Sequence, residues 1–134
     1  SWLRSLQDSH AVIDSTGVCL FSMWGQGMEE LLAMLVAATG INYTMESLIQ
    51  AGERIWNLER LFNLKVGLTK ADDNLPKRML EEPLPDGPGQ GQVVELDQML
   101  TEYYQIRGWD EIGRPTSEKL AQLGLLEPSI TLSK

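Results

Sequence analysis

The feature that most constrains the fold is a long run of apolar side chains at helical spacing between residues 45 and 66. Its apolar stripe consists of Met45, Leu48, Ile49, Gly52, Ile55, Trp56, Phe62 and Val66. Positions three and four residues apart share one face of an α-helix, so the spacing predicts one long amphipathic helix. Thr44 is a favourable N-cap residue, and Gly67 is a favourable helix stop.

Other segments also favour helix. Residues 28–39, MEELLAMLVAAT, are apolar on nearly every side, as is typical of a helix buried within a larger assembly. Helical patterns return at residues 95–106 and 116–123, and no segment shows sustained period-two alternation. Residues 81–94, EEPLPDGPGQGQVV, hold three prolines and three glycines, which predict an irregular surface loop. The prediction is an all-α, multihelical bundle forming a single helical domain over residues 1–134.

Charge and composition exclude several classes of function. The formal net charge is −8, and acidic residues are spread over both halves of the chain. Such a surface repels phosphate backbones, so we expect no nucleic-acid partner. The longest apolar stretch, LLAMLVAATG, is too short to span a bilayer, so we expect no membrane span. A single cysteine rules out an internal disulfide, and this favours a cytoplasmic protein.

The first residues favour a piece of a longer protein. The chain has no initiator methionine, and SWLRSLQDSHAVID already follows a helical pattern. The same stretch lacks the basic end, apolar run and cleavage site of a signal peptide. We therefore expect a fragment of a larger chain.

The stretch DSTGVC, residues 14–19, contains the one cysteine of the chain. A lone cysteine beside Val18 and Leu20 is commonly a small buried apolar residue. The one histidine, His10, lies nine residues upstream and gives Cys19 no evident base, so a nucleophilic role is not favoured. One thiol and one imidazole also fall short of four metal ligands. If Cys19 binds a metal, its partner ligands lie elsewhere, and the residues alone leave a packed thiol and a ligand both open.

The remaining candidate groups favour structural roles. His10 sits among apolar helix positions, as a hydrogen-bonded structural histidine does. We interpret Arg54, Glu59 and Arg60 as a solvated or interhelical ion-pair face rather than a substrate clamp. The four tryptophans are most simply core or interface anchors. The stretch DGPGQG lacks the lysine–serine ending of a phosphate-binding P-loop, and its prolines remove amide donors.

Three longer stretches, read together, carry a family resemblance. They are AVIDSTGVCLF, AGERIWNLERLFNLKVGLTKADDNLPKRMLEEPLPDGPGQGQVVELDQML and YYQIRGWDEIGRPTSEKLAQLGL. In this order and spacing they resemble the C-terminal part of the aldehyde ferredoxin oxidoreductase family, the tungsten-pterin enzymes. The resemblance covers most of residues 11–125.

By this resemblance, DSTGVC matches the family motif Asp-x-x-Gly-Leu-Cys, with Val18 in place of the commoner leucine. The match implies that Cys19 is the fourth thiolate of a [4Fe-4S] cluster, whose other three cysteines lie far upstream. It also implies that Asp14 accepts a hydrogen bond from one of two pterins whose dithiolenes hold tungsten or molybdenum. Gly17 and Val18 complete this cofactor-binding turn. Thiolates suit iron–sulfur clusters, a carboxylate suits the guanidine-like edge of a pterin, and glycine permits a tight turn.

The family oxidises an aldehyde with water to a carboxylic acid and passes two electrons through the cluster to ferredoxin. The resemblance places the acid–base residues upstream, so no catalytic residue is assigned here, and His10 is not given that role. The implied partners are the remaining domains of the parent enzyme, ferredoxin and a small aldehyde, with a homo-oligomer as one open possibility. The fragment alone is expected to hold no cofactor and to be inactive. The alternative is a non-enzymatic helical interaction module with a structural cysteine.

Overall fold

The computed structural model describes residues 2–126. In chain order its helices and 3-10 turns (η) are α1 (Trp2–Ser15), η1 (Leu20–Trp24), α2 (Met28–Thr39), α3 (Met45–Lys65), η2 (Lys70–Asp72), α4 (Lys77–Glu81), α5 (Leu96–Arg107) and α6 (Ser117–Gln122). Over these residues no strand forms, and an isolated antiparallel bridge joins Trp109 to Pro115. The all-α, multihelical prediction is confirmed.

The longest helix forms where the apolar spacing predicts it. The Thr44 hydroxyl accepts a hydrogen bond from the Ser47 backbone N–H at 3.1 Å, and the Ser47 hydroxyl accepts one from the Thr44 N–H at 2.9 Å. This reciprocal cap satisfies two donors at the start of α3. Beyond α3, Gly67 has a φ of 101°, a left-handed conformation that glycine adopts without a steric penalty.

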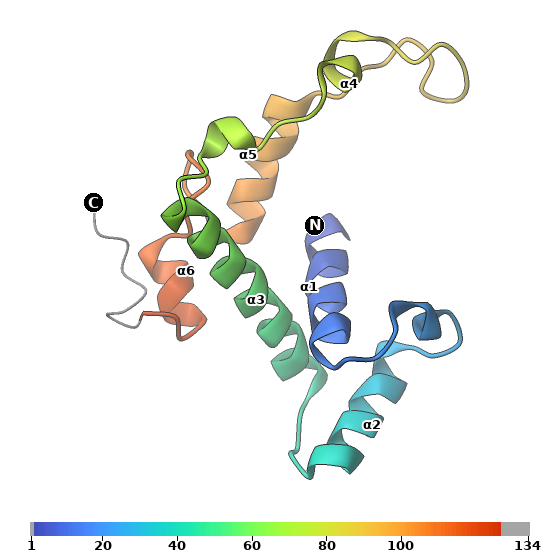
Figure 1. Cartoon of the computed structure of the whole chain (residues 1–134), viewed down its shortest axis with the longest axis vertical. Coiled ribbons are helices and arrows are strands. Elements are labelled where there is room, and N and C mark those ends of the chain that lie inside the picture. The colour runs from blue at the N-terminus through green and yellow to red at the C-terminus, as the bar shows by residue number, and fades with distance from the viewer. Residues whose placement is uncertain (1, 127–134) are drawn as a thin grey trace.

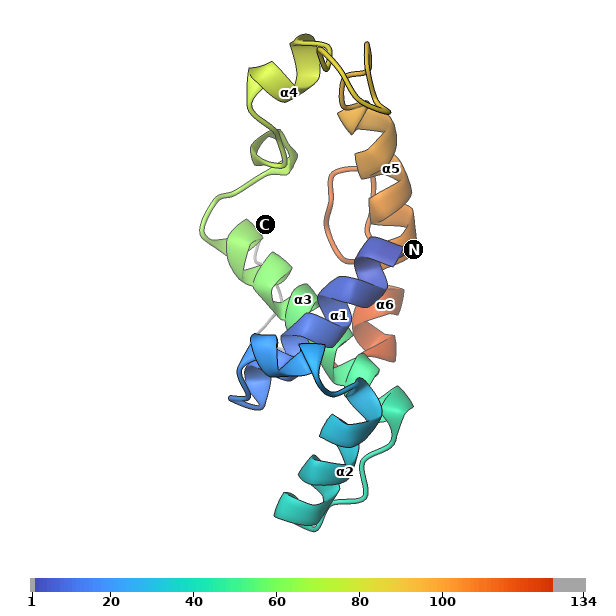
Figure 2. The same ribbon diagram turned by 90° about the vertical axis from the view of Figure 1, so that its right-hand side faces the viewer.

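The helices surround α3, which runs through the middle of an elongated molecule (Figure 1). Helix α1 packs against α3 and crosses it obliquely (Figure 2), while α2 lies beside the first turns of α3 at one end. Helix α5 lies toward the other end and also touches α1. Helix α4 and the loop that follows it project away from the body at that end (Figure 1). The fold is therefore an open arrangement of helices rather than a closed bundle.

The crossing of α1 over α3 depends on a glycine. A Cβ atom at Gly52 would overlap the backbone carbonyl of Asp8, so the two helices can meet this closely only where α3 has no side chain. Beside the crossing lies an apolar cluster of buried residues from α1, α2 and α3, namely Val12, Ile13, Leu31 and Leu48. The glycine in the predicted apolar stripe is thus the contact point of the two helices.

The surface of α3 differs from the simple amphipathic prediction. Phe62 and Val66, at the end of the predicted stripe, are exposed, whereas Glu53, Asn57 and Arg60 are buried. The buried polar residues face partners that come from distant parts of the chain. The spacing of apolar residues identifies the helix. It cannot identify these partners, because it depends only on the order of polar and apolar residues within one segment.

Much apolar surface is exposed. The exposed fraction is 86% for Trp24, 75% for Trp2 and 72% for Phe21. In α2, whose sequence predicts burial within a larger assembly, Leu31 is fully buried and Met34 is 45% exposed. Within residues 2–126 these side chains stay exposed, so their surfaces are available for contacts with other domains or chains.

The proline- and glycine-rich segment is irregular, as predicted. It runs from the end of α4 at Glu81 to the start of α5 at Leu96, and nearly all of its residues are exposed. A pair of backbone hydrogen bonds between Leu84 and the Gly91–Gln92 turn closes it into a loop. Among the described residues, no helix is both long and apolar enough to cross a membrane.

Candidate functional site

The DSTGVC stretch forms the turn that ends α1 and leads into η1. The Thr16 N–H still bonds to carbonyls of the last helical turn, and the Gly17 N–H donates to the Asp14 carbonyl at 3.2 Å. Gly17 then takes a φ of 75°, which turns the chain out of the helix. Cys19 follows in an extended conformation, with φ −64° and ψ 127°, as the N-cap of η1. A helix terminus and one left-handed glycine therefore set the backbone path between Asp14 and Cys19.

The turn presents its chemical groups to the outside of the chain. Asp14, Gly17 and Cys19 are exposed, while Val18 is half-buried and packs against the apolar cluster of α1, α2 and α3. Among the described residues, the Cys19 side chain is therefore not packed into the apolar cluster. Val18 anchors the turn by its apolar side chain, and the residues on either side of it face away from the core.

Exposed apolar side chains follow Cys19 directly along the chain. Leu20, Phe21 and Trp24 follow Cys19 in η1 and are themselves exposed. The rings of Phe21 and Trp24 pack edge to face, with their centroids 5.5 Å apart. An exposed apolar segment thus begins at the residue after Cys19, and covering it with a neighbouring domain would limit solvent access to this part of the chain.

Cys19 offers one thiolate donor, and Asp14 offers one carboxylate acceptor. These two groups fit a cofactor site whose other contacts come from residues outside this stretch. Within residues 2–126 no group of three or more histidine, cysteine, aspartate or glutamate side chains is placed to hold a metal ion. Cys19 would therefore contribute one ligand to a cluster completed from outside this stretch. An exposed thiolate is the donor type that iron–sulfur clusters require.

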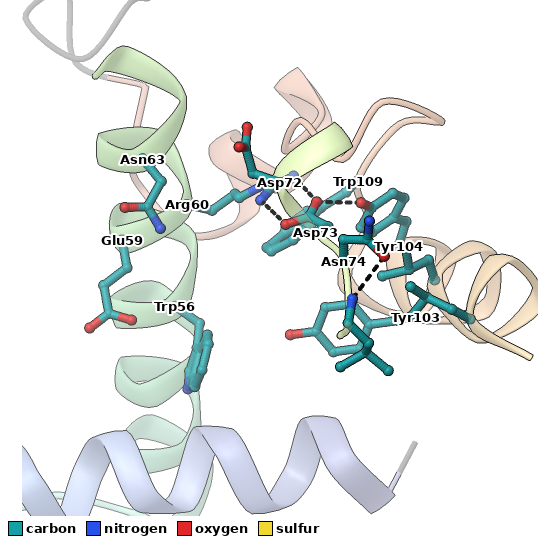
Figure 3. Close-up of a pocket in the computed structure, with 13 residues that line it drawn as sticks. Trp56, Glu59, Arg60, Asn63, Asp72, Asp73, Asn74, Tyr103, Tyr104 and Trp109 are labelled. Carbon is teal, nitrogen blue, oxygen red and sulfur yellow. Dashed lines mark hydrogen bonds and ion pairs between the residues drawn. The ribbon is translucent and has the colours of Figure 1, made fainter. Parts of the chain in front are cut away.

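A second polar site, which the sequence did not reveal, centres on Arg60 (Figure 3). The guanidinium of Arg60 binds both carboxylate oxygens of Asp73, at 2.7 and 2.5 Å, and its Nε donates to the Gly113 carbonyl at 2.7 Å. The Tyr104 hydroxyl also donates to Asp73. The cluster lines a cavity of about 360 Å³ whose wall includes Trp109. It joins the segment after η2 to α3, α5 and the turn around Gly113.

This cluster shifts two pKa values in opposite directions. Burial raises the pKa of Asp73, but hydrogen bonds from Arg60 and Tyr104 and the charges of Arg60 and Lys70 outweigh it. The net pKa therefore lies below the ordinary 3.8. Burial, followed by the hydrogen bond to the Asp73 carboxylate and its negative charge, raises the pKa of Tyr104 to about 12. Asp73 is therefore ionised and Tyr104 protonated at neutral pH.

A buried ion network joins four helices. Arg107 and Asp8 are 0% and 1% exposed, and their side chains meet at 2.5 Å. Arg4 lies 3.4 Å from the other Asp8 oxygen and 3.1 Å from Glu53, which also binds Lys119 at 2.9 Å. The network ties α1 to α3, α5 and α6. Apart from the Arg4–Asp8 pair within α1, its partners lie far apart in sequence, so no local pattern could have revealed these pairs.

Asp14 also lies on the rim of a groove between α1 and α3, of about 300 Å³. His10 and Asp14, four residues apart, line it from α1, and Trp56 and Glu59 line it from α3. His10 is half-buried in this groove. Glu59 is exposed, as predicted for a solvated face, whereas its neighbour Arg60 is buried.

Comparison with known proteins shows which family the chain resembles. The chain matches the family described as "Aldehyde ferredoxin oxidoreductase, domains 2 & 3" over residues 1–125. It is 53% identical over 122 residues to the tungsten-containing aldehyde ferredoxin oxidoreductase of Pyrococcus furiosus and 52% identical to that of Thermococcus kodakarensis. These matches cover 90% of this chain and 20% of each relative. A protein of Pyrococcus furiosus named "Aliphatic sulfonate oxidoreductase, WOR-like subunit" is 35% identical over 127 residues, covering 87% of this chain and 20% of that protein.

Proposed function

Because the chain belongs to the aldehyde ferredoxin oxidoreductase family, we propose that it is the C-terminal helical part of a tungsten-containing oxidoreductase. The chain spans about one fifth of the length of the relatives it matches, so the activity belongs to the whole enzyme. That activity is the oxidation of an aldehyde with water to a carboxylic acid, with two protons and two electrons released. The higher identity to the aldehyde enzymes than to the sulfonate enzyme favours an aldehyde substrate.

In this proposal Cys19 supplies one thiolate to a [4Fe-4S] cluster. The observation that carries the assignment is the exposed position of Cys19 on the turn after α1, followed along the chain by the exposed rings of Phe21 and Trp24. A cysteine kept for packing would be buried with the apolar cluster, where Val18 lies instead. The cluster, when bound, accepts single electrons and relays them to ferredoxin.

Asp14 contacts a pterin in the same proposal. Its carboxylate is exposed one residue before the end of α1, and the described residues place no hydrogen bond or ion pair on it. A free carboxylate can accept two parallel hydrogen bonds from a guanidine-like edge. Gly17 provides the left-handed turn, and Val18 fixes that turn on the core. The chain therefore presents the pterin contact and the cluster ligand from one short turn.

This assignment also predicts the partners of the chain and its cellular compartment. The remaining domains of the enzyme would supply the other three cluster cysteines and the acid–base residues. Ferredoxin would take the electrons, and a cytoplasmic location suits an exposed thiol that must stay reduced. The chain alone would hold neither cluster nor tungsten, since it offers one thiolate.

The test is electron transfer in the full-length enzyme. We expect the unsubstituted enzyme to reduce ferredoxin in the presence of an aldehyde and water. Asp14→Asn should keep the iron and weaken pterin binding by about 1.5–3 kcal/mol, because one charge-assisted hydrogen bond is lost. Absence of aldehyde-dependent ferredoxin reduction by the loaded enzyme would overturn the proposed activity.

A further inference from the structure

The groove between α1 and α3 contains a second carboxylate, that of Glu59, besides Asp14. The two come from different helices, and His10 and Trp56 lie beside them in the same groove. Its volume of about 300 Å³ is at the lower end of the range of about 300–1,000 Å³ for small-molecule sites. A space of this size suits one planar heterocycle rather than a whole extended cofactor.

The groove carries uncompensated negative charge. Within residues 2–126, neither Asp14 nor Glu59 has a hydrogen bond or an ion pair from its carboxylate. The adjacent cation, Arg60, is engaged by Asp73 and the Gly113 carbonyl. Figure 3 shows the Glu59 side chain on the side of α3 away from that pair. Two free carboxylates on one groove favour a ligand whose edge carries several N–H donors.

The wall of the groove is aromatic and fixed. The Trp56 Nε1–H donates to the Gln7 carbonyl at 2.8 Å, which ties the indole to α1. The guanidinium of Arg107, itself buried, lies over the Trp56 ring, 5.5 Å from its centroid, and adds a second contact to the indole. A ring held in this way can pack against a planar ligand without losing further side-chain freedom.

We propose that Glu59 is a second carboxylate contact for the donor-rich edge of the pterin, acting with Asp14 across the groove and with Trp56 as its wall. The inference rests on the proposed function, which gives Asp14 its pterin contact. It adds a binding residue from α3, whereas the sequence motif indicates only residues of the turn that ends α1. Glu59 would hold the heterocycle in place and would exchange no proton with the substrate.

The experiment measures cofactor retention in the full-length, loaded enzyme. Pterin release is followed by the fluorescence of the oxidised pterin, with tungsten and iron contents measured on the same samples. Glu59→Gln keeps the shape of the side chain and removes its charge, so we expect release to be roughly ten- to a hundredfold faster, with iron unchanged. Glu59→Asp retains a carboxylate and should release pterin more slowly than Glu59→Gln. The matched control is Glu102→Gln, an exposed mid-helix glutamate on α5 that does not line the groove.

Each outcome is decisive. If Asp14→Asn speeds release but Glu59→Gln behaves like Glu102→Gln, the inference fails and the proposed function stands. If neither Asp14→Asn nor Glu59→Gln changes release, the pterin assignment fails together with the inference. Joint loss of iron and pterin in Glu59→Gln would mean general destabilisation and would also overturn the inference.

Discussion

At the scale of single residues, glycine and a few buried polar groups determine the local geometry. Gly52 permits the crossing of α1 and α3, and Gly17 turns the chain between the proposed pterin contact and the proposed cluster ligand. Burial and the Asp73 carboxylate raise the pKa of Tyr104, whereas the pKa of Asp73 is lowered, against the effect of burial, by Arg60, Tyr104 and Lys70. The role of each of these residues can be tested by one substitution.

Gly52→Ala should destabilise the fold, because its Cβ would overlap the Asp8 carbonyl and force α1 away from α3. Overpacking of this kind costs about 1–3 kcal/mol. Chemical denaturation would measure the change in the free energy of unfolding. Gly25→Ala is the matched control, since its nearest neighbour would lie at 3.8 Å, and its change should stay within about 0.5 kcal/mol. Equal stabilities of the two variants would contradict the close crossing.

The titration of Tyr104 tests the Arg60 cluster. One of the three tyrosines should ionise near pH 12, because burial and the Asp73 carboxylate raise the pKa of Tyr104 to about 12 from the ordinary 10.0. Ultraviolet absorbance of the phenolate measures this, and Asp73→Asn should lower that pKa while Asp97→Asn should not. Three phenols titrating together near the ordinary value would rule out the cluster.

The same shifts predict how stability depends on pH. The raised pKa of Tyr104 contributes stability that is complete below pH 10.0, its ordinary pKa, and is lost as the pH rises through about 12. The lowered pKa of Asp73 contributes stability above its ordinary 3.8 that is lost as the pH falls through the folded-state value. Tyr104→Phe should abolish the alkaline component and also reduce the acid component, because Asp73 loses the Tyr104 hydrogen bond that helps to lower its pKa. Chemical denaturation over a range of pH values measures both components.

At the scale of elements, sequence patterns predicted what depends on local order. The long helix, its Thr44 cap and the irregular loop followed from spacing and from proline and glycine content, and the structure confirms them. The patterns could not show that Arg60 meets Asp73 or that Arg107 meets Asp8. These pairs join distant segments, and their burial depends on tertiary packing.

For the same reason, sequence patterns indicated some residues of the candidate site and missed others. By resemblance, the DSTGVC motif indicates Asp14 and Cys19 as the proposed cofactor contacts, because both lie on one turn and such a turn has a local sequence signature. No local pattern indicates that Glu59 shares a groove with Asp14, since the two residues come together only when α1 packs on α3. The residues alone left a packed thiol and a ligand both open, whereas in the described chain Cys19 is exposed and the half-buried Val18 packs against the apolar cluster.

At the scale of the whole molecule, the exposed apolar surface predicts association. Phe21, Trp24 and the outer face of α2 have no cover within the described chain. The isolated 134-residue chain should therefore self-associate and bind an apolar fluorescent dye, and Phe21→Ser with Trp24→Ser should reduce both effects. Analytical ultracentrifugation and dye titration measure them, with Trp109→Phe as a buried control. A monomeric chain that binds no dye over a wide concentration range would count against an interdomain surface.

The central claim is that Cys19 is a cluster ligand, and the most direct measurement is low-temperature EPR of the reduced full-length enzyme together with its iron content. Cys19→Ala should lose or severely weaken the [4Fe-4S] signal and lower the iron content, while tungsten held through the pterins is retained at least in part. Cys19→Ser, which keeps the side-chain size, should resemble Cys19→Ala because a hydroxyl is a poor substitute for a soft thiolate. A normal [4Fe-4S] signal with full iron content in Cys19→Ala would contradict the account.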